Sequence, residues 1–506
     1  MTRTPASKQR ATAWLRSRGA AWLVAFIACS STSQLDLFTS NQQTYLVRAV
    51  ALSRAPRILA PDWFVRTADP VPGFTVLAEP LVALGEWATR LANALLGAVL
   101  LVSLAELARG PESASPRAPA RTVAWVALFA LLWVALPTSL RSLVFDGVAD
   151  QRAYSDYLQP SNAGVLLVLA VSLALQEQSL AAVLASAAAA WLHPTYLLSA
   201  GLLVFGVCLL DVRAGRAPSR TSRVALLGFL ALAPPTLWAL RVFLPNPELA
   251  NRASEVLVSE RMPYHALLGA WLGPGAMLRV AVIVLAIALT RGRTRALLAL
   301  CASATLAATA LVAVLGRPDL RLLFPWRTSV WLVPSSTALL FGWLSAAFSR
   351  ERAPWLRLCL VPLLAACGYR FLRPNSRAAA EDYLGVALAR TVPVRERERW
   401  ALLVPVTWES VRLNAPADIY VDFKSHPYKD NEVLEWWRRV QLARAVFPSN
   451  GELGCESLAT VLDQEPRLGF VLAPASFQRS ACPMLSFVTR DRDGTLYGVR
   501  GRTSAE

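Results

Sequence analysis

The sequence predicts an all-α polytopic membrane bundle followed by a small extracytoplasmic α/β domain, from three observations. The chain has 506 residues, of which 55% are hydrophobic. Apolar runs about as long as a bilayer is thick recur from residue 20 to residue 370, and Arg, Pro or Gly interrupts each of them. After residue 370 the composition changes to short, mixed segments. Because a membrane-spanning helix needs roughly 20 apolar residues, the runs predict about 11 transmembrane helices.

The expected spans follow one another from the N-terminus to residue 370. We place them at residues 14–35, 88–107, 122–144, 162–176, 179–192, 196–210, 223–243, 274–290, 295–315, 328–348 and 354–370. The first is expected to stay uncleaved, because no small-x-small cleavage site follows it. The apolar run from 74 to 107 exceeds one span, and we predict a single long helix whose first half stands above the membrane.

The net charge of +17 is distributed as in a membrane protein. With a cytoplasmic N-terminus, the segments on that side hold 18 Lys and Arg residues and three acids, whereas the opposite loops hold 11 Arg residues and ten acids. This asymmetry predicts a cytoplasmic N-terminus and an extracytoplasmic C-terminal domain. The expected location is a bacterial inner membrane. Basic faces interleaved with aromatic residues are absent, which argues against nucleic acid as a partner.

The tail from residue 371 to 506 is predicted as a separate α/β domain after the transmembrane domain 1–370. Short segments with β-branched residues predict strands at 401–406, 417–423 and 467–474. Apolar residues at helical spacing and an acidic first turn predict a helix at 430–447. The step Asp493-Gly494, between two further apolar segments, predicts a hairpin.

Cysteine usage divides in the same way as the domains. Two of the seven cysteines, Cys455 and Cys482, lie in the tail, where an oxidising compartment favours pairing. Because spacing cannot establish geometry, a disulfide and two free thiols both stay open. The others lie in apolar spans and are expected to be packing residues: Cys29, Cys208, Cys301, Cys359 and Cys367.

The outer loop 36–74 holds the first candidates for chemistry. Asp62 and Asp69 precede an aromatic residue and a proline, so both are expected at turns. A carboxylate there serves as a general base, as a metal ligand or only as a turn-forming residue. The segment Tyr45 to Leu59 has three Arg residues and roughly helical apolar spacing, so it either contacts lipid phosphates or simply covers the bundle.

Other outer loops add candidates for substrate binding. His193 and Tyr196 belong to a His-Pro-Thr-Tyr corner at the mouth of the bundle, where the imidazole either binds a ligand or is satisfied by a backbone carbonyl. Arginine binds phosphate by paired hydrogen bonds, although it also anchors helices at the interface. The loop residues considered for this role, with a neighbouring histidine, are Arg261, His265, Arg321 and Arg327.

Metal and nucleotide chemistry have weaker sequence support. Asp146, Asp150 and Asp156 share one outer loop and can help to bind a divalent cation, but a solvated loop is the favoured interpretation. We therefore assign no metal ligands and leave a divalent cation open as a cofactor. Gly-rich phosphate loops and the HExxH and GxSxG motifs are absent from the sequence, so nucleotide hydrolysis, zinc peptidase and serine hydrolase chemistry have no support.

The tail holds a further polar stretch at the end of an expected strand. Lys424 and His426 lie there, just before the helix that carries Trp436. Ligands bind at the carboxyl ends of strands in open α/β sheets, and Trp commonly stacks on sugars. Because adjacent helical positions diverge by about 100°, one of Trp436 and Trp437 is expected to pack in the core.

The architecture resembles the GT-C superfamily of membrane glycosyltransferases. The resemblance rests on the outer loop 36–74, the cytoplasmic N-terminus and the tail domain. The chain also resembles a group of bacterial multi-pass membrane proteins without an established activity. The stretches that carry this second resemblance are NQQTYL (41–46), DWFVRTADPVPGF (62–74), QPS (159–161), HPTY (193–196) and VDFKSHPYKDNEVLEWWRR (421–439).

The GT-C resemblance implies transfer of a sugar from a polyprenyl-phosphate donor to a glycan, lipid or protein acceptor in the cell envelope, beside membrane lipid. Such enzymes commonly have Asp-Glu where this chain has Asn41-Gln42, ahead of Tyr45. An amide cannot accept a proton, so the base must be Asp36, Asp62 or Asp69, with Asn41, Gln42 and Tyr45 binding the sugar. The alternative is a non-enzymatic transporter or assembly scaffold for polysaccharide or lipid-linked glycan.

Overall fold

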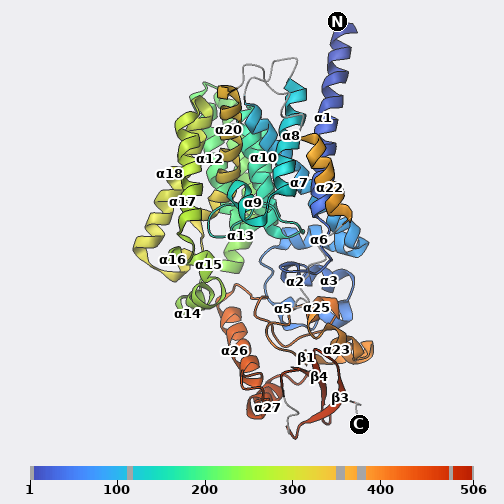
Figure 1. Ribbon diagram of the computed structural model, residues 1–506. Helices are drawn as coiled ribbons and strands as arrows, with labels where there is room; N and C mark the ends of the chain where they lie inside the picture. The colour runs from blue at the N-terminus through green and yellow to red at the C-terminus, as the bar shows by residue number, and fades with distance from the viewer. Residues whose placement is uncertain (1–4, 111–117, 349–358, 373–382, 478–481, 504–506) are drawn as a thin grey trace. The chain divides into compact units, whose positions relative to one another are not determined.

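The computed structural model describes residues 5–110, 118–348, 359–372, 383–477 and 482–503. Figure 1 follows the chain through its elements. The chain forms two compact units, and each is described by itself. The first, called the helical unit, comprises Met1–Gln34, Arg90–Trp238 and Met262–Asn375. The second, called the mixed unit, comprises Leu35–Thr89, Ala239–Arg261 and Ser376–Glu506.

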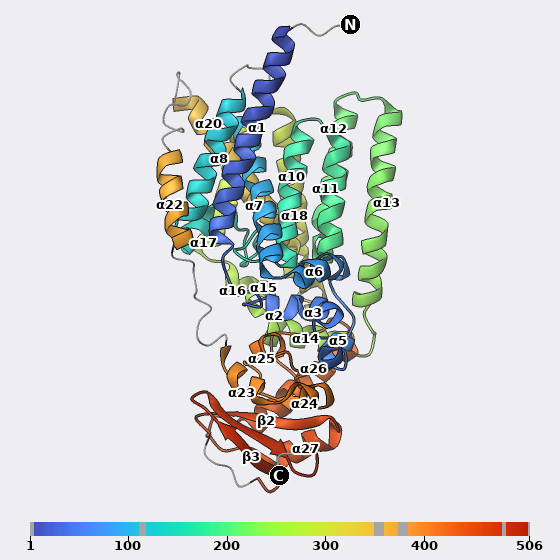
Figure 2. The ribbon, with the colours of Figure 1, turned by 90° about the vertical axis from the view of Figure 1, so that its right-hand side faces the viewer.

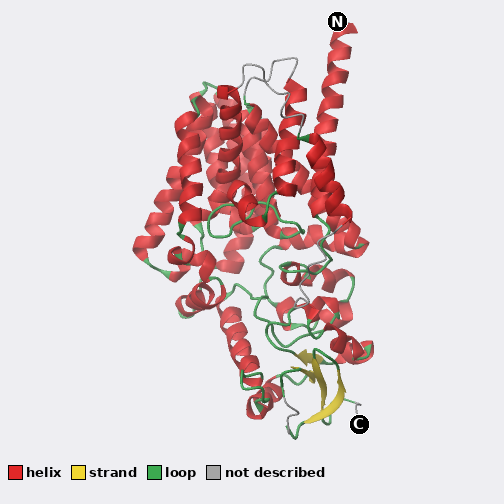
Figure 3. Cartoon of the chain, in the orientation of Figure 1, coloured by secondary structure: helices red, strands yellow, loops and turns green. Residues whose placement is uncertain are grey.

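The helical unit contains the long apolar helices, drawn in red in Figure 3. Its elements are α1 (Pro5–Thr32), α7 (Glu86–Arg109), α8 (Ala118–Ala135), α9 (Thr138–Phe145), η1 (Pro160–Ala163), α10 (Gly164–Leu175), α11 (Ser179–Leu192), η2 (Pro194–Tyr196), α12 (Leu197–Arg213), α13 (Pro218–Phe243), α15 (Pro263–Ala266), α16 (Leu268–Trp271), α17 (Pro274–Leu289), α18 (Gly292–Leu315), α19 (Pro318–Arg321), η4 (Pro325–Thr328), α20 (Ser329–Phe348) and α22 (Leu360–Leu372). Figure 2 shows α10, α11 and α12 running side by side.

Among the residues that the structure describes, five helical stretches are long and apolar enough to cross a membrane: Glu86–Arg109, Pro194–Arg213, Pro218–Phe243, Gly292–Leu315 and Pro318–Ala346. Shorter apolar helices accompany them among the described residues. The structure is therefore that of a multi-pass membrane protein, and the number of eleven spans stays a prediction.

Small residues let the helices of this unit approach closely. Ala21, Ala25 and Ala28 repeat on one face of α1, and all three are buried. This face packs against α8, where Trp133 donates a hydrogen bond from its indole to the Thr32 hydroxyl at 3.1 Å. Close backbone approach through small residues is typical of helix packing in membranes.

The predicted long helix between residues 74 and 107 is wrong. The chain forms α6 (Pro72–Leu84) and then α7, with a break at Gly85. Gly85 has a φ of 115°, a backbone conformation that residues other than glycine rarely adopt. The break gives α6 to the mixed unit and most of α7 to the helical unit.

The mixed unit combines short helices with one four-stranded sheet. The strands are β1 (Ala401–Leu403), β2 (Leu468–Pro474), β3 (Leu485–Arg490) and β4 (Gly494–Val499), in the order β1-β2-β4-β3. Strands β1 and β2 are parallel, and the other two pairs are antiparallel. The helical segments are α2 (Gln42–Tyr45), α3 (Val47–Ser53), α4 (Pro56–Leu59), α5 (Trp63–Arg66), α6, α14 (Ala250–Val256), η3 (Leu257–Arg261), α23 (Val386–Thr391), α24 (Val394–Arg399), α25 (Ser410–Asn414), α26 (Asp430–Val446) and α27 (Cys455–Gln464).

Hydrophobic residues cover both faces of this sheet. Along β2, Val471 joins a core cluster with Trp436 of α26, whereas its neighbours Phe470 and Leu472 join a second cluster with Trp408. This alternation is expected, because successive side chains of a strand point to opposite faces. Strands β1, β2 and β4 are therefore buried between helical layers, whereas the edge strand β3 is partly exposed.

Most local predictions for the tail are confirmed. The helix predicted at 430–447 is α26, and the hairpin predicted at Asp493-Gly494 joins β3 to β4. The strand predicted at 417–423 is wrong, because only an isolated bridge between Ile419 and Leu402 forms there. The backbone N–H of Ile419 instead donates to the Asp62 carboxylate at 3.3 Å, so a side chain replaces a strand partner.

Long-range links add what local patterns did not predict. A disulfide joins Cys455 to Cys482, whose Cα atoms are 5.6 Å apart, and so connects the start of α27 to the segment before β3. The compact units also differ from the division into 1–370 and 371–506, because 35–89 and 239–261 pack with the tail. The outer loop 36–74 is thus part of the mixed unit.

Candidate functional site

A pocket in the mixed unit gathers polar residues from three distant parts of the chain. Its cavity volume is about 30 Å³. The outer loop 36–74, the end of η3 and the turn before α26 supply its walls. The lining residues are Asn41, Thr44, Tyr45, Arg48, Phe64, Asp69, Pro70, Val71, Arg261, Lys424, His426 and Tyr428. Six of these were candidates from the sequence: Asn41, Tyr45, Asp69, Arg261, Lys424 and His426.

Asp69 is the carboxylate that lines the pocket. Its Oδ1 accepts a hydrogen bond from the Val71 backbone N–H at 2.9 Å, and its Oδ2 accepts one from the Thr75 hydroxyl at 2.7 Å. Both donors lie in the chain entering α6, so the carboxylate is held at the start of that helix. The helix dipole also favours a negative charge at this end.

Arg48 is a buried cation in the pocket wall, with 8% of its surface exposed. Its Nη2 donates to the Phe64 carbonyl at 2.8 Å and to the Thr67 hydroxyl at 2.9 Å, and its guanidinium lies 4.5 Å from the centre of the Phe64 ring. Burial lowers the pKa of Arg48, and the nearby Asp69 carboxylate opposes this effect. The expectation that this arginine of the Tyr45–Leu59 segment contacts lipid phosphate is therefore not met.

Arg261, His426 and Lys424 form the opposite part of the pocket. Arg261 donates from Nε to His426 Nδ1 at 3.1 Å and from Nη2 to the Lys424 carbonyl at 3.1 Å. His426 Nδ1 also lies 3.1 Å from the Lys424 carbonyl oxygen. Because a guanidinium keeps its protons, the contact with Arg261 requires Nδ1 to accept, which assigns the proton of the neutral ring to Nε2. Burial lowers the pKa of His426 to about 3, and the Arg261 charge adds to this effect.

The His426 Nε2 atom and the Lys424 ammonium differ in their polar contacts. The buried His426 Nε2 has no hydrogen-bond partner among the residues that the structure describes. The Lys424 ammonium lies 3.5 Å from a Glu409 carboxylate oxygen. A buried N–H without a partner costs free energy, so a ligand that accepts from His426 Nε2 recovers that cost.

The lining chemistry matches an anionic ligand that also carries hydroxyl groups. The lining residues include three cations, Arg48, Arg261 and Lys424, and one carboxylate, Asp69. Arg and Lys are the usual donors to phosphate oxygens. The aromatic side chains of Tyr45, Phe64 and Tyr428 add flat walls.

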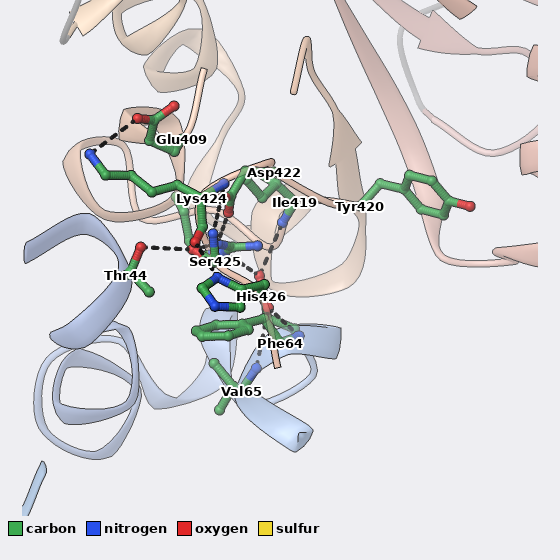
Figure 4. Close-up of polar contacts among 12 residues, drawn as sticks. Thr44, Phe64, Val65, Glu409, Ile419, Tyr420, Asp422, Lys424, Ser425 and His426 are labelled. Carbon is green, nitrogen blue, oxygen red and sulfur yellow. Dashed lines mark hydrogen bonds and ion pairs between the residues drawn. The ribbon is translucent and has the colours of Figure 1, made fainter. Parts of the chain in front are cut away.

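Asp62 lies in a buried ion cluster and does not line the pocket. Figure 4 labels its partners Phe64, Val65 and Ile419. The Asp62 Oδ1 accepts from the Phe64 backbone N–H at 2.9 Å, which caps α5, and its Oδ2 accepts from Arg412 Nε at 2.9 Å. The other end of the Arg412 guanidinium pairs with Asp422 and donates to the Ser425 hydroxyl at 2.9 Å. At most 1% of any of these four residues is exposed.

In this cluster one guanidinium, that of Arg412, is shared by the two carboxylates of Asp62 and Asp422. Burial by itself would lower the pKa of Arg412, but Asp62 and Asp422 more than offset it and raise the pKa above its usual value. A fully buried, doubly paired guanidinium of this kind holds structure together, since losing one partner leaves an uncompensated charge. The geometry thus favours a structural role for Asp62, and its catalytic role stays a prediction.

Three other sequence candidates of the mixed unit lie outside the pocket lining. Asp36 is exposed and accepts from the Tyr383 hydroxyl at 3.3 Å. Gln42 is buried, and its Oε1 accepts from the Phe38 backbone N–H at 2.9 Å. Trp436 is fully buried and donates from its indole to the Asp422 carbonyl at 2.9 Å, so it cannot present a face to a sugar.

The helical unit holds the remaining candidates, and two of them share a polar cluster. Gln151 connects two of them, since its Oε1 accepts from Arg327 Nε at 2.8 Å and its Nε2 lies 3.0 Å from His265 Nδ1. His193 is buried in edge-to-face contact with Tyr196, with ring centres 5.1 Å apart. Arg321 is half-buried at the end of α19.

The acids considered for a cation are paired with arginines. Asp156 forms two hydrogen bonds with Arg141, at 3.1 and 3.0 Å, and Asp150 pairs with Arg152 at 2.9 Å. Asp146 lies 3.7 Å from the same Arg152. Across the described ranges, no three His, Cys, Asp or Glu side chains gather as a set of metal ligands.

Comparison with known proteins gives limited matches. The model of a domain of unknown function (DUF6798) matches residues 398–443. No curated protein matches the chain. Among solved structures, the archaeal oligosaccharyltransferase AglB from Archaeoglobus fulgidus, in complex with an inhibitory peptide and a dolichol-phosphate, is 13% identical with a TM-score of 0.43, over 90% of this chain and 69% of that one.

Two structures of ArnT from Cupriavidus metallidurans are similar to the same degree. The apo structure is 14% identical with a TM-score of 0.41, over 96% of this chain and 98% of that one. The structure bound to undecaprenyl phosphate is 13% identical with a TM-score of 0.41, over 98% and 99% of the two chains. With TM-scores below 0.5, the function has to be argued from this chain's own residues.

Sequence reasoning missed several residues of the pocket and of the buried ion cluster. Arg48 was grouped with interfacial arginines, although it comes one helical turn after Thr44 and Tyr45, which share the pocket. Arg412 had no sequence signal, because its partner Asp62 is 350 residues away. The amide cluster, the acids of the outer loop, Arg261 and the polar stretch at 422–430 were the sequence features that pointed to this part of the molecule.

Proposed function

We propose that the protein is a GT-C-like membrane glycosyltransferase whose active site is the pocket of the mixed unit. It moves a sugar from a polyprenyl-phosphate donor to a glycan, lipid or protein acceptor at the outer face of a bacterial inner membrane. The observation that carries the proposal is the convergence of Asp69 with Arg48, Arg261, Lys424 and His426 in one pocket.

In this proposal the donor phosphate binds the cationic side of the pocket. Arg261, Lys424 and the His426 Nε2–H stabilise the phosphate as it leaves with its electron pair. Asp69 takes the proton of the acceptor hydroxyl while the acceptor oxygen forms a bond to the anomeric carbon and the carbon–phosphate oxygen bond breaks. Attack from the face opposite the phosphate inverts the configuration at that carbon. Asn41 and Tyr45 hydrogen-bond the sugar.

The test is transfer by the purified full-length protein in lipid nanodiscs. A panel of polyprenyl-phosphate-linked sugars is offered with cell-envelope glycan and lipid acceptors, and the glycosylated product is measured by mass spectrometry. We expect product with the wild-type protein and a large loss with Asp69→Asn. If Asp69→Asn and Asp62→Asn, at matched folded concentrations, both keep the full wild-type rate, the catalytic proposal is wrong.

The second candidate is a non-enzymatic transporter or assembly scaffold for lipid-linked glycan. One observation favours it: Asn41 lines the pocket where the GT-C resemblance implies an acid. This candidate predicts that the wild-type protein binds a polyprenyl-phosphate-linked sugar in nanodiscs but forms no product with any acceptor.

A further inference from the structure

Arg412 lies behind the pocket and contacts both of its main walls through hydrogen bonds. Its Nε bonds to Asp62, two residues before Phe64 of the pocket lining. Its Nη1 bonds to Asp422 and Ser425, which flank Lys424 of the lining. One guanidinium therefore connects the outer loop to the turn before α26 (Figure 4).

The carboxylates on either side of Arg412 fix the backbone that carries the lining residues. Asp62 accepts from the N–H groups of Phe64 and Val65 at 2.9 and 3.4 Å. Asp422 accepts from the N–H groups of Lys424 and Ser425 at 2.8 and 2.5 Å. Each acid thus closes a turn on its own wall and binds the shared arginine with its other oxygen.

Two further contacts extend the connection to the pocket itself. The Arg412 guanidinium lies 5.5 Å from the centre of the Phe64 ring, which also contacts Arg48. The Ser425 hydroxyl lies 3.4 Å from the hydroxyl of Thr44, a lining residue. Every link in this chain of contacts is buried or part-buried, so water competes with it only weakly.

We infer that Arg412 is a positioning residue, which fixes the spacing between the Phe64 wall and the Lys424–His426 wall of the pocket. The inference rests on the proposed function only for the identity of the ligand that the pocket binds. Lysine cannot replace it, because one ammonium cannot hold two carboxylates and a hydroxyl in the planar geometry of a guanidinium. A misplacement of about 1 Å in such a wall can cost on the order of 100-fold in rate or affinity.

The test compares Arg412→Lys with the matched control Arg467→Lys in the full-length protein. Arg467 also forms an ion pair with a buried acid of the mixed unit, Asp418, at 2.7 Å, but it does not line the pocket. Hydrogen–deuterium exchange is measured on peptides that cover residues 62–69 and 422–428. We expect Arg412→Lys to speed exchange by about 10-fold or more in both peptides together, and Arg467→Lys to change neither.

Binding of inorganic pyrophosphate, measured by calorimetry, is the second readout. Arg412→Lys is expected to weaken it by about 10- to 100-fold, whereas Arg467→Lys leaves it within about 2-fold. Should Arg412→Lys prevent folding, Ser425→Ala, which removes one hydrogen bond, is expected to speed exchange at 422–428 and to weaken pyrophosphate binding in the same direction.

The outcomes separate this inference from the proposed function. Exchange that is unchanged, or faster in only one of the two peptides, overturns the positioning role even if the wild-type protein transfers sugar. If Arg412→Lys speeds exchange in both peptides and the wild-type protein forms no product, the positioning role is supported and the glycosyltransferase proposal is contradicted. Equal effects of both Arg→Lys variants on both readouts reduce Arg412 to a general stabilising residue.

Discussion

Two polar groups in the mixed unit use the same outer loop in different ways. Asp69 lines the pocket. Asp62 belongs to the buried ion cluster, where its oxygens accept hydrogen bonds from Phe64, Arg412 and Ile419. In the cluster, two carboxylates share the buried Arg412, whereas the pocket lining holds three cations, one carboxylate and a histidine N–H without a described partner. Asp69 and Asp62 both accept hydrogen bonds from protein groups, so the difference teaches that a place in a pocket lining, more than residue type, separates a candidate catalytic acid from a structural one.

The largest expected effect comes from replacing the proposed base, Asp69, and comparing the result with the same substitution at Asp62. Asp69→Asn removes the proposed base and is expected to lower the transfer rate by about 100- to 10,000-fold. It costs about 1 kcal/mol of stability, since an amide replaces one hydrogen-bond acceptor. Transfer assays and thermal unfolding on the same preparations check this. A loss of transfer with Asp62→Asn that exceeds the loss with Asp69→Asn, at equal folded fractions, would reverse the comparison.

Removing the charge of Arg412 is expected to lower stability more than Asp69→Asn does. Arg412→Met leaves two buried carboxylates without their cation and is expected to lower the free energy of unfolding by about 3–5 kcal/mol. Denaturant unfolding in detergent measures this, with Arg438→Met, from an exposed pair, as the control expected to change it by less than about 1 kcal/mol. Similar losses for both variants would mean that the buried ion cluster contributes no more to the free energy of unfolding than an exposed ion pair does.

The disulfide sharpens the distinction between stability and the pocket. The bond between Cys455 and Cys482 closes a separation of 27 residues far from the lining residues in sequence. Replacing both cysteines by serine is expected to cost about 2–4 kcal/mol of stability. Pyrophosphate affinity of the folded variant is expected to stay at the wild-type value. A marked loss of affinity would mean that the α27 region shapes the pocket.

The smallest expected effect is the pH dependence of stability from His426. Its folded pKa of about 3 lies below the ordinary value of 6.5, so between these values the unfolded state binds more protons. Stability from this group therefore rises with pH across the window and is lost as the pH falls below about 6.5. Thermal unfolding at pH 7 and pH 5 should show a smaller decrease for His426→Asn than for the wild-type protein. Equal decreases would contradict a neutral, buried histidine.

The sequence predicted the elements whose causes are local. The helix α26 follows from its acidic start and apolar spacing, and the β3–β4 hairpin follows from Asp493-Gly494. The break at Gly85 had a local cause too, but the hydrophobicity of the run outweighed one glycine in the prediction. Patterns within a few residues were therefore sufficient for element type and less reliable for continuity.

The candidate site was predicted in part, for a physical reason. Asp69, Asn41 and Tyr45 stood out in one loop, and Lys424 and His426 in another, but nothing local required them to meet. The role of Asp62 depends on Arg412, and the burial of Arg48 depends on carbonyl groups of Phe64 and Thr67. Such partners are set by tertiary packing, so the same Asp-Trp-Phe sequence fits a catalytic turn and a buried helix cap equally well.

The most direct test of the central claim is a cryo-EM structure of the full-length protein in nanodiscs with added polyprenyl phosphate. The account predicts phosphate density in the pocket of the mixed unit, within hydrogen-bond distance of His426 Nε2 and of Arg261 or Lys424, with Asp69 as the nearest carboxylate. Phosphate density at the Gln151–His265–Arg327 cluster of the helical unit, with the pocket empty at saturating lipid, would contradict it.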